Sequence, residues 1–189
     1  AHRLMEKVCD IHIQVYDKYL DAVGDFIEII HAGDDMGTQK TSFYSPELYR
    51  EMIYPHQKRL LQAIKNKTKA KVFFHSCGSI VNLLDDMIEA GVDILNPVQH
   101  SAKGMEPDVL KQRFGERLCF QGGIDQQLVL SRGTEDDVRE EVKYCLKHLA
   151  PGGGYILNAV HNIVPEVPGN NLITMYKSAR EYGRYPLNL

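Results

Sequence analysis

The chain has 189 residues, a net charge of -3 and 43% hydrophobic residues, the composition of one soluble domain with a real core. No apolar run approaches the roughly 20 residues that span a bilayer, and the near-neutral charge gives no reason to propose nucleic-acid or membrane binding. The four cysteines, Cys9, Cys77, Cys119 and Cys145, do not have the spacing of a disulfide framework. This cysteine usage favours a reducing, cytoplasmic compartment.

The apolar pattern predicts a leading helix followed by five strand-helix units. Helical spacing at residues 4–20 precedes a β-branched, apolar strand at 26–31. Ser45 and Pro46 predict the start of a helix that reaches about residue 65. Strands at 72–75, 92–95, 118–121 and 155–158 then alternate with helices at 80–90, 105–114, 134–149 and 168–182.

Short apolar strands, each followed by an amphipathic helix, indicate parallel βαβ connections. An open doubly wound sheet and part of a (β/α)8 barrel both fit this order. No glycine-rich phosphate fingerprint follows the first strand, which weakens the dinucleotide-binding version. A complete eight-stranded TIM barrel takes about 250 residues. We therefore predict an incomplete barrel, in which residues 1–189 form the C-terminal part of a single barrel domain and supply strands four to eight. The pattern starts almost directly in a helix from Ala1, so we expect the first three strands to lie outside this chain.

Polar side chains lie at the C-terminal ends of all five predicted strands. They are Asp34, Asp35 and Gln39 at the end of the first strand, His75 and Cys77 at the second, Asn96, Gln99 and His100 at the third, Gln121 and Asp125 at the fourth, and Asn158 and His161 at the fifth. In a (β/α)8 barrel, the C-terminal strand ends open on the one face where active sites are built. Clustering at five consecutive strand ends therefore predicts a shared site.

The triplet His75-x-Cys77 is the sharpest local feature of that set. In an extended chain, residues i and i+2 point to the same side, so an imidazole and a thiolate could reach one metal ion. A buried histidine bonded to backbone is the alternative reading. His161 adds a third candidate ligand, and three His and Cys ligands with an open fourth position describe a catalytic zinc site. Asp34 or Asp35 would be a further ligand, an orienting carboxylate or an ordinary loop residue.

The amide and carboxylate side chains at the strand ends suit substrate binding. Asn96, Gln99, Gln121 and Asp125 are predicted to line the substrate mouth, with hydrogen bonds to the loop backbone as the alternative role. Zinc with an open position could bind a thiol substrate and lower its pKa, giving a thiolate near neutral pH.

Several of these segments resemble a known superfamily. Residues 158–163, Asn-Ala-Val-His-Asn-Ile, followed by Glu-Val-Pro at 166–168, resemble the final strand-end motif of uroporphyrinogen decarboxylases. His161 falls on the active-site histidine of that family, and Asn162 replaces its usual glycine. Residues 74–78, Phe-His-Ser-Cys-Gly, instead resemble the His-x-Cys motif of the related methyltransferases, which usually supply a later cysteine where this chain has His161. Segments 33–39, 96–99 and 122–125 resemble the decarboxylase-like branch of the superfamily.

The resemblance implies two enzymatic functions. The first is a zinc-dependent, corrinoid-linked methyltransferase with His75, Cys77 and His161 as ligands, in which zinc activates a thiol and a methylcorrinoid on a partner protein donates the methyl group. The second is a metal-free decarboxylase of uroporphyrinogen or a smaller relative, in which His161 hydrogen-bonds a substrate carboxylate. The candidate catalytic residues are His161, Asp34 and Asp35.

A third reading is non-enzymatic. An inactive piece of a barrel would expose strand edges that pair with a second copy, giving a homo-oligomer. Because three strands and their loops are expected to lie outside this chain, we expect the 189 residues alone to lack activity.

Overall fold

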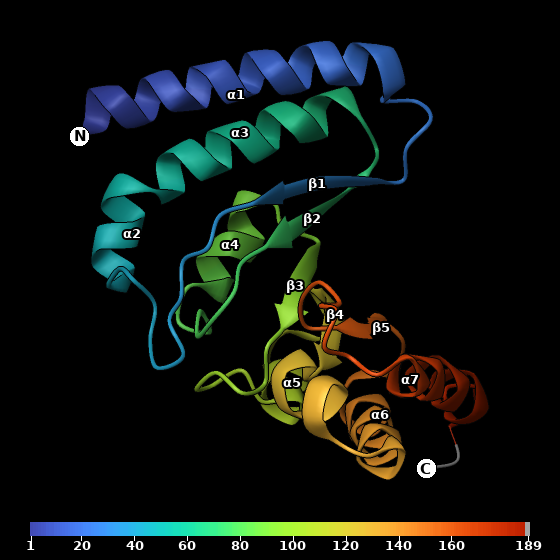
Figure 1. Cartoon of the computed structure of the whole chain (residues 1–189). Coiled ribbons are helices and arrows are strands. Elements are labelled where there is room, and N and C mark those ends of the chain that lie inside the picture. Colours follow the sequence, from blue (N-terminus) through green and yellow to red (C-terminus); the bar gives the residue numbers. More distant parts are fainter. Residues whose placement is uncertain (188–189) are drawn as a thin grey trace.

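In the computed structural model, which describes residues 1–187, five parallel strands form one sheet in chain order (Figure 1). The strands are β1 (Ile29–Gly33), β2 (Lys71–His75), β3 (Ile94–Val98), β4 (Cys119–Ile124) and β5 (Tyr155–Ala159). The helices are α1 (His2–Val23), α2 (Pro46–Met52), α3 (Tyr54–Lys67), α4 (Leu84–Ala90), α5 (Pro107–Phe114), η1 (Gln126–Leu130), α6 (Glu135–Leu149) and α7 (Gly169–Tyr182). Consecutive parallel strands joined by helices confirm the predicted incomplete (β/α) barrel.

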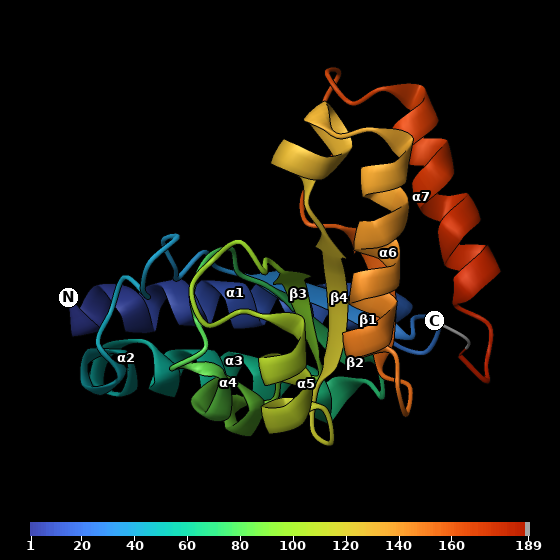
Figure 2. The same ribbon diagram turned by 90° about the horizontal axis from the view of Figure 1, so that it is seen from below.

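The sheet has a helix-covered face and an inner face. Ile30, Val72, Leu95 and Phe120 belong to one buried core with residues of α3, α4 and α5. A second core joins β4 and β5 to α6 and α7, and Figure 2 shows α6 alongside β4 with α7 outside it. Because side chains alternate along a strand, the polar residues paired across β2 and β3 lie on the opposite, inner face.

Local sequence signals set several helix starts as predicted. The hydroxyl of Ser45 accepts a hydrogen bond from Leu48 N at 3.2 Å, and Pro46 occupies the first position of α2. Thr134 and Asp137 form a reciprocal capping box at the start of α6. These caps satisfy main-chain N–H groups that have no partner within the helix.

Two predicted helices differ from the structure. The helix predicted from Pro46 to about residue 65 is interrupted at Ile53 and splits into α2 and α3. Pro55 is the physical reason, because proline has no N–H to bond back into the preceding turn. The helix predicted at 80–90 begins only at Leu84; Ile80 and Leu83 form a turn whose N–H to C=O bond measures 2.8 Å.

The strand boundaries also shift toward the C-terminus. Phe26, predicted to open the first strand, lies in a turn and is 86% exposed. β3 continues to Val98, and β4 continues through Gly122 and Gly123, whose φ angles of 111° and 97° suit glycine. The strands therefore carry their polar residues deeper into the sheet than the sequence indicates.

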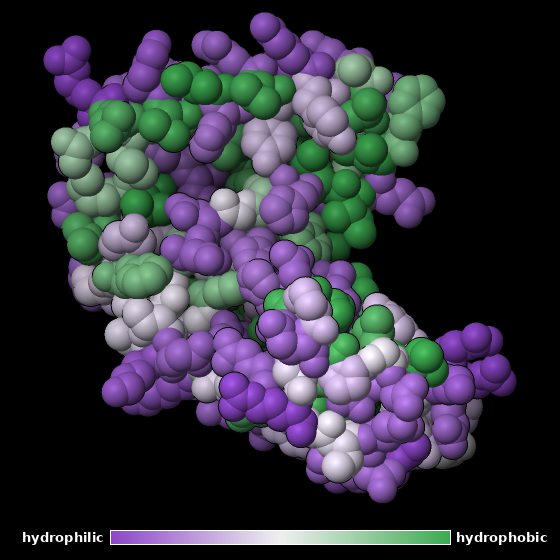
Figure 3. Space-filling view, in the orientation of Figure 1, coloured by the Kyte–Doolittle hydropathy of each residue, from purple (hydrophilic) through white to green (hydrophobic). Residues whose placement is uncertain are grey.

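Apolar side chains also remain on the surface, along α1 and near the start of β1 (Figure 3). The exposed residues of α1 are Leu4, Val8, Ile11 and Val15. They recur at helical spacing and form one stripe on a helix whose other side packs against α3. Among residues 1–187, no helix has both the length and the apolar composition that crossing a bilayer requires.

Candidate metal and substrate site

The imidazole of His75 and the thiol of Cys77 lie side by side at the C-terminal end of β2. Their Nε2 and Sγ atoms are 3.4 Å apart. Ser76 points to the other side, where its hydroxyl accepts a hydrogen bond from Met36 N at 3.0 Å and is fully buried. The alternation predicted for the triplet is therefore present.

His161, on the loop after β5, completes a group of three. One ligand atom each from His75, Cys77 and His161 all lie within 4.8 Å of one another. The rings of His75 and His161 meet edge to face, with centroids 6.1 Å apart. The backbone N–H of Val160 bonds to the carbonyl of Ile124 at 2.9 Å, which ties this loop to the end of β4.

The neighbouring carboxylates Asp34 and Asp35 face different surroundings. Asp35 accepts a hydrogen bond from Cys77 N at 2.9 Å and lies 3.6 Å from His75 Nε2, next to the three-residue group. Asp34 lines a separate cavity of about 490 Å³ between α1, α3 and the β1–β2 sheet. Burial raises the pKa of Asp34, the charge of Asp35 raises it further, and His12 opposes the shift. Of the two carboxylates, Asp35 is therefore the one that lies beside His75 and Cys77.

Two of the predicted substrate residues lie beneath the site, where Asn96 contacts His75 and Gln121 contacts Asn96. Nδ1 of His75 is 2.6 Å from Oδ1 of Asn96, and Nδ2 of Asn96 donates to Oε1 of Gln121 at 2.9 Å. Because the amide accepts at Oδ1 and donates at Nδ2, His75 donates from Nδ1 and presents its Nε2 lone pair toward Cys77. This arrangement is the kind that orients a histidine toward a metal ion in proteins that hold one.

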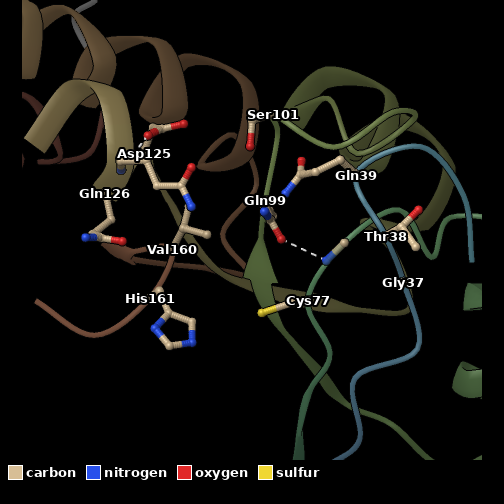
Figure 4. Close-up of a pocket in the computed structure, with 12 residues that line it drawn as sticks. Gly37, Thr38, Gln39, Cys77, Gln99, Ser101, Asp125, Gln126, Val160 and His161 are labelled. Atoms are coloured by element: carbon tan, nitrogen blue, oxygen red, sulfur yellow. Dashed lines mark hydrogen bonds between the residues drawn. The ribbon is translucent and has the colours of Figure 1, made fainter. Parts of the chain in front are cut away.

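The other two predicted substrate residues line a cavity of about 450 Å³ above the group (Figure 4). Gln99 accepts a hydrogen bond from Gly78 N at 2.8 Å, which joins the β3 loop to the Cys77 loop. Oδ1 of Asp125 accepts from Gln127 N and Leu128 N at 2.8 and 2.7 Å, so this carboxylate caps η1. Val160 and His161 close the cavity on the β5 side.

The sequence analysis did not identify Glu141, whose carboxylate forms hydrogen bonds behind this cavity. Oε1 of Glu141 on α6 lies 2.7 Å from Nε2 of His100 and also accepts from Asp125 N at 3.3 Å. The hydrogen bond to Glu141 raises the pKa of His100 against the opposing effect of burial. Helical periodicity alone could not distinguish Glu141 from the exposed acids around it, because only the fold brings it behind the loops. The five-residue helix η1, which adds Gln126 and Gln127 to the cavity, was also missed.

Burial controls the reactivity of the cysteines. The pKa of Cys77 is raised to about 11, chiefly by burial and then by the charge of Asp35.

His100, Glu141 and Cys145 form a second group, in which one nitrogen, oxygen or sulfur atom of each residue lies within 4.8 Å of the others. There, however, His100 and Glu141 bond to each other and the buried Cys145 thiol donates to the Gly123 carbonyl at 3.4 Å. The polar atoms of this second group are therefore engaged in hydrogen bonds within the protein.

Comparisons with known proteins agree with the fold and identify a family. The family model for uroporphyrinogen decarboxylase (URO-D) matches residues 1–182. Curated uroporphyrinogen decarboxylases from Chlorobium phaeobacteroides and Trichodesmium erythraeum are 29% and 27% identical over 96% and 95% of this chain, and the matches span 49% and 47% of their own length. The chain thus spans about half the length of these relatives.

A solved structure shares the fold. A methyltransferase from Methanosarcina mazei superposes with a TM-score of 0.75 at 18% identity, covering 97% of this chain and 50% of that one. At this identity the likeness supports the architecture, and the chemistry has to be argued from the site itself.

Proposed function

Because this chain belongs to the uroporphyrinogen decarboxylase family, we propose that it forms the C-terminal, active-site-bearing part of a zinc-dependent methyltransferase that transfers a methyl group to a thiol or a similar acceptor. The observation that carries the proposal is the group of His75, Cys77 and His161, whose ligand atoms converge within 4.8 Å. A methylcorrinoid on a partner protein is the proposed methyl donor.

The donor set fits zinc. In a tetrahedral site with Zn–N near 2.0–2.1 Å and Zn–S near 2.3 Å, a nitrogen and a sulfur ligand lie about 3.5 Å apart. The 3.4 Å between His75 Nε2 and Cys77 Sγ matches that spacing. His161 is exposed, so its ring can turn toward the other two ligands without moving a packed core. Zinc held there with one open position would supply Lewis-acid activation of a thiol.

The residues around the ligands have distinct roles in the proposal. Asn96 holds His75 in the tautomer that presents Nε2. Asp35 fixes the main chain of Cys77 and stands close enough to His75 Nε2 to serve as a fourth ligand or as a hydrogen-bond acceptor for an entering thiol. Gln99 fixes the Gly78 turn and lines the cavity through which an acceptor would reach the ligands.

The second candidate is a metal-free decarboxylase, and the curated relatives favour it by name. Uroporphyrinogen carries many carboxylates, which are normally bound by arginine or lysine. The cavity beside His161 has no such side chain among the described residues that line it. This contrast is why we place the methyltransferase first.

Zinc content of the intact protein tests the proposal. Wild-type protein purified without chelators should hold one zinc per chain, and Cys77→Ser should lose both zinc and methyl transfer. Cys119→Ser is the matched control, because Cys119 is half-buried like Cys77 but lies outside the ligand group, and it should keep its zinc. Absence of stoichiometric zinc, together with an active Cys77→Ser variant, would overturn the proposal, and uroporphyrinogen turnover would then favour the decarboxylase.

A further inference from the structure

The cavity above the ligand group has an unusual lining. Four of its twelve lining residues are glutamines, namely Gln39, Gln99, Gln126 and Gln127. Figure 4 shows Gln39 and Gln99 extending toward each other from different loops, and Gln126 on the side of His161. A carboxamide both donates and accepts hydrogen bonds and carries no charge. The described side of the mouth is therefore rich in neutral hydrogen-bonding groups.

The charges at this mouth are unfavourable for an anion. Within the described part of the chain, the lining residues include Asp125 and the ionisable His161 but no lysine or arginine. Proteins that bind carboxylate, phosphate or sulfonate groups ordinarily supply guanidinium or ammonium groups, or main-chain N–H groups at a helix start.

The main-chain N–H groups at the start of η1, beside this cavity, already have a hydrogen-bond acceptor. The main-chain N–H groups of Gln127 and Leu128 point to the N-terminal end of η1, where they could have received an anionic ligand. Both instead donate to Oδ1 of Asp125, which is 91% buried and acts as a built-in carboxylate. An incoming anion would compete with this carboxylate and be repelled by it across a few ångströms, well inside the Debye length of about 8–10 Å.

We infer that this half of the mouth receives an uncharged, hydrogen-bonding part of the substrate, of the carboxamide or hydroxyl class, and excludes carboxylate and sulfonate groups. The inference rests on the proposed function in taking this cavity as the acceptor site. It gives the methyl acceptor a chemical class, a thiol whose tail is neutral. Gln126 and Gln99 are the residues placed to hold that tail beside His161 and Cys77.

Paired probes of equal length test the inference in the intact protein. The first pair is 3-mercaptopropionamide against 3-mercaptopropionate with zinc-loaded protein, measured by calorimetry. The second pair, propionamide against propionate, lacks sulfur and is measured by ligand-observed NMR with and without zinc. In both pairs the amide should bind at least about tenfold more tightly, because the acid loses hydrogen bonds and meets Asp125.

A charge variant adds a second readout. Gln126→Lys should reduce or invert the preference for the amide by placing an ammonium group in the cavity. Gln62→Lys, on the exposed surface of α3, is the matched control and should leave the preference unchanged.

The outcomes separate the two proposals. Protein that binds no zinc but still prefers propionamide would overturn the methyltransferase and leave the neutral-substrate inference standing. Protein that binds zinc but prefers the acid of either pair would overturn the inference and leave the metal proposal standing. Absence of saturable binding for all four probes would also overturn the inference.

Discussion

The Nδ1 atom of His75 lies 2.6 Å from Oδ1 of Asn96, and this contact leaves the other imidazole nitrogen, Nε2, facing Cys77. The Nδ2 atom of Asn96 donates to Oε1 of Gln121 at 2.9 Å, and this second bond favours the amide orientation that places Oδ1 against His75. Three adjacent strands thus cooperate to present a single lone pair, since His75, Asn96 and Gln121 come from β2, β3 and β4.

Removing this support should weaken metal binding without removing a ligand. We expect Asn96→Ala to lower zinc affinity by about 10–100-fold, the usual effect of losing the hydrogen-bond partner of a metal-bound histidine. Competition with a chromogenic chelator measures it, and Asn66→Ala, at an exposed position of α3, is the control. The ¹⁵N shifts of His75 should show the Nδ1–H tautomer in the wild type without metal. A variant with wild-type affinity and an unchanged tautomer would show that Asn96 does not orient the ring.

The close approach of two loops at Gly78 gives a second prediction. Gly78 has a φ of 85°, and a Cβ there would clash with the carbonyl carbon of Gly37. Gly152 has a similar φ of 77° but no atom within 4 Å of its ideal Cβ. Gly152→Ala should cost about 1–2 kcal/mol from backbone strain alone. Gly78→Ala should cost more and should also displace Cys77.

Urea unfolding of the two variants measures the difference in the free energy of unfolding. Because the backbone strain is matched, the excess cost at Gly78 reports the contact between the Gly37 and Gly78 loops. Equal costs at the two positions would contradict the close packing of these loops.

The sequence could predict the fold class and the convergence of His75, Cys77 and His161, because both follow from strand alternation and strand order. Alternation places His75 and Cys77 on one side of the chain, and the order of strands and helices brings the end of β5 close to the end of β2. It could not predict that Asp34 and Asp35 separate, because adjacent loop residues have no fixed period. Nor could it place Asn96 beneath His75, since register across two strands is a property of the assembled sheet.

The pair of His100 and Glu141 should make stability depend on pH. The bond to Glu141 raises the pKa of His100 in the folded state, with the charge of Asp125 adding to it. A raised pKa stabilises the fold fully below the unfolded value near 6.5, and this contribution is lost as pH rises through the folded value. The free energy of unfolding should therefore fall more between pH 6 and pH 8 in the wild type than in His100→Gln.

A substitution of Glu141, the partner of His100, measures what its hydrogen bonds contribute to stability. Glu141→Ala leaves His100 and Asp125 N without their acceptor and should cost about 1–3 kcal/mol at pH 6. Tyr144 and the buried Cys145 also face this pair, so guanidinium unfolding curves should be compared below the range where thiols and phenols ionise. Parallel pH profiles for the wild type and His100→Gln would show that the pair contributes no pH-dependent stability.

Two phenylalanines test where the core lies in relation to the sheet. Phe120 on β4 is fully buried between the sheet and its helices, so Phe120→Ala should cost about 3–5 kcal/mol through lost burial and the cavity left behind. Phe26 is equally large and sits where the apolar pattern placed the start of the first strand, yet it is 86% exposed in the turn before β1. Phe26→Ala should therefore change the free energy of unfolding by no more than about 0.5 kcal/mol.

Thermal and urea unfolding of the Phe120→Ala and Phe26→Ala variants in the intact protein measure this difference in stability. A cost at Phe26 that approaches the cost at Phe120 would mean that the first strand begins earlier or that another segment covers this turn, and the position of β1 in the sheet would have to be revised.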